Sequence, residues 1–166
     1  MKGTLATMRI GVTGHSNLTA DSEPPIAEAI RGLLRDRAPG GLVGVTCLAR
    51  GADQVFAEVV LELGGAVEVV LPAADYRTRK VKPDNAAKFD RLLSRASSVH
   101  TMPFDTSDSA AYMAASERLL GGVDEVIAVW DGRPAAGSGG TADVVIAAQQ
   151  RGLPVTVVWP AGTSRA

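Results

Sequence analysis

The most specific chemical signal in the sequence is a glycine-rich segment from Gly137 to Asp143. Its letters are Gly-Ser-Gly-Gly-Thr-Ala-Asp, and an apolar helical pattern that includes Val144 and Val145 follows it. Backbone N–H groups at such a turn, just before a helix, can approach a phosphate group closely and bind it. The residues expected to bind phosphate here are Gly137, Ser138, Gly139, Gly140 and Thr141.

A second candidate segment follows the first apolar run of the chain and contains Gly14, His15 and Ser16. Glycine permits a tight turn where a side chain would collide with a ligand. The Ser16 hydroxyl and the backbone N–H groups can donate hydrogen bonds, and His15 is a candidate base. We expect these residues to contact the ligand. An ordinary turn between a strand and a helix is the alternative explanation of the same pattern.

A third candidate segment contains Arg50, Gly51 and Asp53. Arg50 comes just before a predicted helix, where the backbone N–H groups and the helix dipole already favour an anion. An arginine at that position can bind phosphate through two parallel hydrogen bonds. All three residues are therefore expected in the ligand site. Asp53 lies in the first helical turn, so offsetting the helix dipole is an alternative role for it.

Two carboxylates, Asp131 and Asp143, are the candidate catalytic residues. Asp131 follows a strongly apolar segment of strand length, where it could bind a ribose hydroxyl or a metal ion. Because Gly132 comes next, an aspartate that initiates a turn is the alternative interpretation. We expect Asp131, Gly132 and Asp143 to belong to the ligand site.

The elements that would position these residues alternate regularly along the chain. Strands are predicted at residues 8–13, 42–47, 66–71, 99–102, 125–130 and 155–159, and helical patterns lie between most of them, with a polar segment at 72–85. Such alternation predicts a doubly wound, Rossmann-like α/β fold, with a mostly parallel sheet and helices on both faces. Ligands of such sheets bind beside the carboxyl ends of the strands, where the three candidate segments would meet.

Composition limits the classes of protein to which the chain can belong. Its 166 residues fit a single domain spanning residues 1–166. A net charge of −1 and a pI of about 6.1 provide no broad basic surface, so no nucleic-acid partner is expected. Cys47 is the single cysteine, which excludes an internal disulfide and favours a reducing, cytoplasmic location.

The sequence gives no reason to expect a cofactor or a membrane. One cysteine and two histidines are too few for a typical Cys/His zinc site, although carboxylates could still bind magnesium. No apolar run reaches the ~18 residues of a membrane-spanning helix. The N-terminus lacks the basic-then-apolar pattern of a signal peptide. The chain is thus expected to be a soluble protein without a metal site or a cofactor.

Two of these segments resemble known patterns. The run from Ala49 to Asp53, followed by a helix and Gly64-Gly65, resembles the "RGID…GG" segment of the DprA/Smf Rossmann domain. The Gly139-Gly140-Thr141 turn resembles the P-G-G-x-G-T-x-x-E turn of the LOG phosphoribohydrolases. Both groups belong to the SLOG superfamily of Rossmannoid domains, and the resemblance extends from about Arg9 to Pro160. It implies a Rossmann-like fold and a nucleotide-derived ligand.

The resemblance also implies two possible activities. In the LOG pattern a catalytic glutamate comes three residues after the Gly-Thr pair, a position that Val144 occupies here, next to Asp143. The expected function is therefore binding of a nucleotide or a nucleotide-derived small molecule, as a ligand-binding or sensor module. The alternative is a LOG-like nucleotide 5′-monophosphate phosphoribohydrolase, an N-glycosidase that would use Asp143 or Asp131. A homodimer is expected because relatives often pair through helices beside the site.

Overall fold

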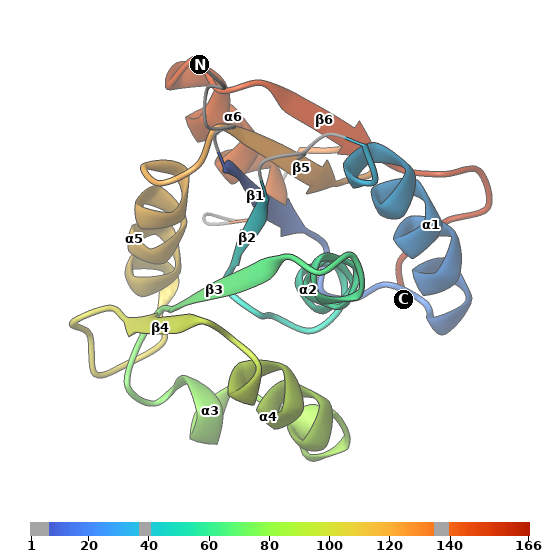
Figure 1. Ribbon diagram of the computed structural model, residues 1–166. Coiled ribbons are helices and arrows are strands. Elements are labelled where there is room, and N and C mark those ends of the chain that lie inside the picture. Colours follow the sequence, from blue (N-terminus) through green and yellow to red (C-terminus); the bar gives the residue numbers. More distant parts are fainter. Residues whose placement is uncertain (1–6, 37–40, 135–139) are drawn as a thin grey trace.

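A single parallel sheet forms the centre of the protein (Figure 1). The computed structural model describes residues 7–36, 41–134 and 140–166. Six strands in the order β4-β3-β2-β1-β5-β6 form this sheet, and every neighbouring pair is parallel. The strands are β1 (Met8–Gly14), β2 (Leu42–Thr46), β3 (Ala66–Leu71), β4 (Ser98–Thr101), β5 (Glu125–Val129) and β6 (Val155–Val158).

Helices cover both faces of the sheet (Figure 1). They are α1 (Glu23–Leu34), α2 (Ala52–Glu62), α3 (Tyr76–Arg79), α4 (Ala86–Ser94), α5 (Ser109–Leu120) and α6 (Thr141–Gln150). On one face α2 contacts α1 and α4, and on the other α5 contacts α6. The predicted fold class, a doubly wound α/β fold of the Rossmann kind, is therefore confirmed.

The strands in the middle of the sheet are apolar because both of their faces are covered. Every residue of β5 is buried. Ile127 and Val129 pack into the core beneath α1 and α2, whereas Val126 packs into the core beneath α5 and α6. By contrast, all four residues of the edge strand β4 are exposed. This gradient is expected for a parallel sheet that is layered between helices.

The sequence-based boundaries of the strands are correct to within one residue. One helix was missed, in the segment expected to be a polar loop at residues 72–85. That segment contains the short helix α3 and a 3₁₀ turn at Pro83–Asn85. Helices of one turn have too little periodicity to be recognised by pattern alone. The miss matters because Tyr76, the first residue of α3, lies at the candidate site.

The C-terminal segment of the chain returns to the start of α1. Leu18 and Arg165 form an isolated antiparallel bridge. Ser22 accepts a hydrogen bond from the Ser164 N–H at 2.9 Å. Among the described residues, no helix combines the length and the apolar character needed to cross a membrane.

Candidate functional site

A cavity of about 610 Å³ opens at the carboxyl ends of β1, β2 and β5. Its size is within the range of roughly 300–1,000 Å³ that is usual for small-molecule sites. Residues that line it come from the loops after β1, β2 and β5, from α3 and α5, and from the start of α6. The three candidate segments of the sequence therefore approach the same edge of the sheet.

The loop after β1 contributes Gly14, His15 and Ser16, all of which line the cavity. Gly14 has a structural reason to be glycine. A Cβ atom there would lie 2.5 Å from Ala52 Cβ and 2.8 Å from Val129 Cβ. The absence of a side chain thus lets β1 pack closely against α2 and β5, independently of any ligand.

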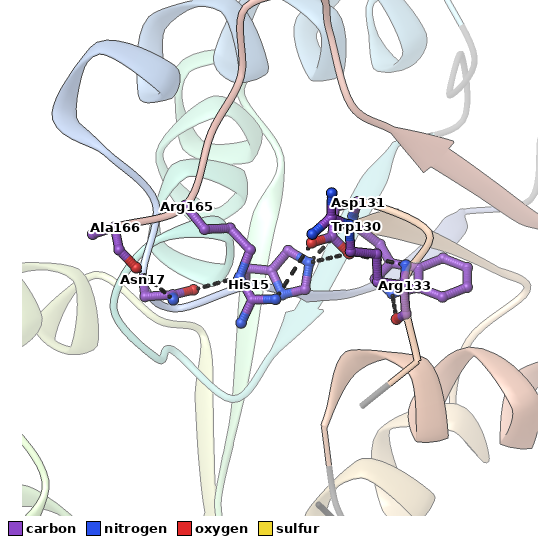
Figure 2. A network of polar contacts seen from close by, with 7 residues as sticks. All are labelled: His15, Asn17, Trp130, Asp131, Arg133, Arg165 and Ala166. Carbon is purple, nitrogen blue, oxygen red and sulfur yellow. Dashed lines mark hydrogen bonds and ion pairs between the residues drawn. The ribbon is translucent and has the colours of Figure 1, made fainter. Parts of the chain in front are cut away.

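His15 is held inside the protein as a neutral imidazole. Its side chain is 8% exposed, and the edge of its ring contacts Trp159. The backbone N–H of Asp131 donates a hydrogen bond to His15 Nε2 at 3.2 Å (Figure 2). The same Nε2 atom also lies 3.3 Å from Asp131 Oδ1. Burial and the nearby Arg165 lower the pKa of His15, and together they outweigh the opposite effect of Asp131.

Asp131 is engaged by the protein and does not line the cavity. Its Oδ1 accepts a hydrogen bond from the Arg133 N–H at 3.0 Å, and its Oδ2 lies 3.4 Å from Arg165 Nη1 (Figure 2). These contacts, with His15, hold the pKa of Asp131 below its ordinary value. Gly132 follows at φ +82°. The structure thus shows Asp131 and Gly132 in a turn, with Asp131 outside the cavity lining.

Two arginines that were not predicted bring positive charge to the cavity. Arg133 and Arg165 both line it. Trp130 Nε1 donates to the Arg133 carbonyl oxygen at 2.9 Å, and Arg165 Nε donates to Asn17 Oδ1 at 3.0 Å (Figure 2). The sequence offered few signals for either arginine, because Arg165 reaches the site only through the packing of the C-terminal segment.

Arg50, the arginine expected to bind phosphate, has another partner. Its guanidinium forms two hydrogen bonds with the Asp84 carboxylate, at 3.0 and 2.8 Å, and it does not line the cavity. Gly51 is also outside the cavity lining. It adopts φ +87°, and a Cβ atom there would lie 2.7 Å from the His15 carbonyl oxygen. Its role is to let the loops after β1 and β2 touch.

Asp53 is the buried carboxyl group of the cavity. It lines the cavity, and its side chain is 7% exposed. Burial raises the pKa of Asp53 to about 7, although the Ala49 N–H and the Thr46 hydroxyl both donate hydrogen bonds to the carboxyl group and partly offset this effect. A carboxyl group with such a pKa exchanges a proton near neutral pH, which neither Asp131 nor an exposed aspartate does.

The loop that carries Asp53 is held in an uncommon conformation. Leu48 is fully buried at φ +59°, a left-handed conformation that non-glycine residues seldom adopt. Its N–H donates to Thr46 Oγ1 at 2.9 Å, and its carbonyl oxygen accepts from Gln54 at 3.3 Å. Gln54 and Asn85 in turn exchange two hydrogen bonds of 2.9 Å.

The start of α6 lines the cavity through Gly140, Thr141, Ala142 and Val144. Asp143 does not line it, so the structure does not place this catalytic candidate beside a ligand. Gly140 has φ −80° and ψ 178°, an extended conformation available to any residue. Three residues predicted to bind phosphate, Gly137, Ser138 and Gly139, lie outside the described residues.

Several residues of the cavity were not predicted from the sequence. They are Asn17, Cys47, Tyr76, Tyr112, Ser116, Trp130, Arg133 and Arg165. Tyr76 could have been found, because it follows β3, whose carboxyl end faces the same edge. Tyr112 and Ser116 lie within α5, and no local signal marks them. Among the residues that the structure describes, no group of three or more His, Cys, Asp or Glu side chains could hold a metal ion.

Comparisons with known proteins identify the fold. DNA processing protein A (DprA) from Streptococcus pneumoniae is 18% identical, with a TM-score of 0.68 over 94% of this chain and 52% of that chain. This chain has the Rossmannoid fold of DprA. DprA from Helicobacter pylori is 18% identical, with a TM-score of 0.65 over 95% of this chain and 68% of that one. TM1055 is 21% identical, with a TM-score of 0.58 over 89% of this chain and 72% of that chain.

At 18–21% identity, these likenesses show a fold shared with DprA and TM1055. The chain spans about half the length of the Streptococcus pneumoniae DprA chain. No family model matches the sequence, and no curated protein matches it significantly.

One expectation is corrected by the DprA-like fold. The low net charge predicts no nucleic-acid partner, but the Helicobacter pylori DprA is described as binding single-stranded DNA. The exclusion is therefore wrong for this fold. Net charge reports the whole surface, whereas a single strand needs only a local groove with cations and aromatic side chains.

Proposed function

We propose that the cavity binds a nucleotide or a nucleotide-derived small molecule, and that the domain acts as a ligand-binding or sensor module. One observation carries the proposal: cationic side chains, a helix N-terminus and aromatic side chains surround the same cavity of about 610 Å³. Nucleotides present the complementary groups, namely phosphates, a polar sugar and a flat base.

Phosphate would bind at the end of the cavity beside β5. Arg133 and Arg165 supply the positive charge there. The first N–H groups of α6, at Thr141 and Ala142, have no acceptor within the helix and lie at its positive end. Backbone groups of this kind bind phosphate well when a cation is near.

The same geometry argues against an N-glycosidase that uses Asp143 or Asp131. Cleavage of an N-glycosidic bond needs a carboxylate that stabilises positive charge at the sugar or activates water. Val144 lines the cavity where the LOG pattern has its glutamate, while Asp143 does not line it and Asp131 is held by the protein. We therefore expect binding without rapid turnover.

A single-stranded nucleic acid is the second candidate ligand. The observation in its favour is the likeness to the Helicobacter pylori DprA, which is described as binding single-stranded DNA. An oligonucleotide would use the same cations and aromatic side chains for its phosphates and bases.

Thermal unfolding with a ligand panel tests these candidates. The panel contains AMP, GMP, CMP, ADP-ribose, NAD, cyclic nucleotides and oligo(dT). A ligand at ~100 times its dissociation constant stabilises the protein by about 2.7 kcal/mol. Stabilisation by small nucleotides supports the proposal, and stabilisation by oligo(dT) alone supports the second candidate. No stabilisation by any of them at millimolar concentration would contradict both.

Two arginine variants form a matched pair for the phosphate site. Arg133→Gln should weaken nucleotide binding ~10-fold or more, the usual effect of losing a hydrogen bond to a charged group. Arg50→Gln should leave the affinity unchanged, since Arg50 is bound to Asp84 outside the cavity. Calorimetric titration measures both affinities. Equal effects of the two substitutions would place the phosphate elsewhere.

Chromatography of the same incubations tests for turnover. Intact AMP, GMP, CMP and IMP after prolonged incubation are expected for a binding module. Release of free base would restore the N-glycosidase alternative. A Val144→Glu variant, which introduces the missing carboxylate, then shows whether the cavity can support hydrolysis at all.

A further inference from the structure

Three polar side chains form the other end of the cavity, beside β2 and β3. Asp53 comes from the first turn of α2, Tyr76 from α3 and Tyr112 from α5, and all three line the cavity. The rings of Tyr76 and Tyr112 meet edge to face at 6.2 Å between their centroids. We call this group the β2–β3 end. In the sheet, β1 lies between β2, which precedes Asp53, and β5, which precedes Arg133.

The Tyr76 hydroxyl is available to a ligand. Its side chain is 6% exposed and lines the cavity, yet its hydroxyl has no hydrogen-bond partner among the residues that the structure describes. Because this hydroxyl opens onto the cavity, it can donate a hydrogen bond to a polar group that binds there.

Asp53 also has hydrogen-bonding capacity to spare. The Ala49 N–H and the Thr46 hydroxyl each donate one hydrogen bond to it. A carboxylate has about four lone-pair positions, so about two remain for a ligand. Thr46 Oγ1 also accepts a hydrogen bond from the Leu48 N–H at 2.9 Å.

We propose that the β2–β3 end binds the heterocyclic base of the ligand, with the Asp53 carboxyl group hydrogen-bonded to the polar edge of the base and Tyr76 donating a further hydrogen bond. The inference rests on the proposed function, because the phosphate at the β5 side sets the orientation of the ligand. The base would lie against the Tyr112 ring, where an aromatic face provides stacking.

The protonation state of Asp53 determines which base edge it complements. Burial raises the pKa of Asp53 to about 7. The titratable groups around it are Cys47 and Tyr76, whose own pKa values are raised by burial, with His15 and Tyr112 on the cavity walls. No ion pair joins Asp53 to a basic side chain of the described residues. Arg50, three positions before it, is paired with Asp84.

Adenine and guanine should therefore respond to pH in opposite directions. A neutral carboxylic acid offers one donor and one acceptor, which match N1 and the N6 amino group of adenine. The ionised carboxylate offers only acceptors, which match the N1–H and N2 amino donors of guanine. Below pH 7 the site favours AMP, and above pH 7 it favours GMP.

Titration of the full chain with AMP and GMP at pH 6 and pH 8.5 tests the inference. The ratio of the two affinities cancels the titration of the shared phosphate and of His15. If only the neutral acid binds adenine, the affinity falls with the neutral fraction, about 30-fold at pH 8.5. The AMP-to-GMP ratio should fall by at least that factor. In Asp53→Asn, whose amide has a fixed donor and acceptor, the ratio should not change with pH.

Two further measurements keep the inference separate from the proposed function. Tyr76→Phe should weaken both nucleotides ~3- to 10-fold, the effect of one neutral hydrogen bond, and leave ribose 5-phosphate unaffected. Asp84 is an exposed carboxylate outside the cavity, so Asp84→Asn is the matched control. It should change neither the AMP-to-GMP affinity ratio nor the affinity for either nucleotide.

The possible failures are distinguishable. If ribose 5-phosphate binds as tightly as AMP, or if the AMP-to-GMP ratio is independent of pH in the natural protein, the phosphate site stands and the base site is wrong. A pH-dependent ratio that persists in Asp53→Asn also contradicts it. If neither nucleotides nor ribose 5-phosphate bind, both proposals fail.

Discussion

At the scale of single residues, burial separates two side chains that look equally suitable in the sequence. Arg50 and Asp53 lie three positions apart at the start of α2, and both were expected at the ligand site. Asp53 is 7% exposed and lines the cavity, whereas Arg50 points outward to Asp84. The sequence identifies the residue types near the site, but the direction of each side chain depends on packing against distant segments.

The buried carboxyl of Asp53 should make stability depend on pH. Its pKa is raised from 3.8 to about 7, so between these values the folded protein holds a proton that the unfolded chain has released. The contribution of Asp53 to stability therefore falls as pH rises through this range. The Asp53→Asn variant has no carboxyl group at this position, so it does not lose stability in this way as pH rises. Its stability relative to the natural protein should increase by about 3 kcal/mol between pH 5 and pH 8.

Urea unfolding of both proteins at pH 5 and pH 8 measures this difference. Asp84→Asn is the control, because that carboxyl group is exposed. A difference between Asp53→Asn and the natural protein that is the same at both pH values would mean that Asp53 is not buried as a neutral acid.

At the scale of elements, the loop after β2 is determined by tertiary contacts. The positive φ of Leu48 is maintained by Thr46, Gln54 and Asn85, the last of which is more than thirty positions away in the sequence. Gly51 in the same loop combines a positive φ with a close approach to His15. Local patterns predicted a helix start here, and correctly, but not the conformation that presents Asp53 to the cavity.

Gly51 and Gly132 provide a matched test of this close approach. Both have a positive φ, of +87° and +82°, but only Gly51 has atoms within 4 Å of the position of a Cβ. Gly132→Ala should cost about 1 kcal/mol, from the left-handed conformation alone. Gly51→Ala should cost more, about 2–4 kcal/mol, because its φ of +87° and ψ of −124° lie outside the left-handed region and because overpacking adds a further ~1–3 kcal/mol.

Denaturant unfolding of the two alanine variants gives both values. Gly51→Ala should also weaken nucleotide binding, because the clash displaces the His15 backbone at the cavity. Equal losses of stability in the two variants would contradict the importance of the contact between the two loops.

The hydrophobic pattern of the sequence predicted the positions of the strands but not the backbone geometry of the site. Every strand was located within one residue, because covered strands such as β5 are continuously apolar. Gly140, in the glycine-rich turn, is extended at φ −80° and ψ 178°. Glycine permits a left-handed conformation without requiring it, so composition alone does not determine the backbone of a glycine-rich turn.

At the scale of the whole molecule, strand order explains why distant segments meet. The loops after β1, β2 and β5 follow neighbouring strands, although more than 100 residues separate β1 from β5. The β/α alternation predicted this edge correctly. It could not predict that Arg165 returns to Asn17 and Asp131, because irregular segments have no periodic signal. The expected homodimer stays a prediction.

Folding of the whole molecule changes the pKa values of two buried groups in opposite directions. Burial and Arg165 lower the pKa of His15 from 6.5, and burial raises that of Asp53 to about 7. Just below pH 6.5, folding therefore favours release of a proton from His15 and binding of a proton by Asp53. The two contributions oppose each other, so the stability of the natural protein should depend less on pH in this range than the stability of either single variant.

Single substitutions should expose the two opposing contributions. In Asp53→Asn only His15 remains, and its lowered pKa makes stability rise with pH, by up to about 1.4 kcal/mol per pH unit. In His15→Gln only Asp53 remains, and stability should fall with pH by a similar amount. Guanidinium unfolding at closely spaced pH values from 5.5 to 6.5 measures these slopes, and the double variant should be flat. Slopes of the same sign in the two single variants would show that folding does not shift the two pKa values in opposite directions.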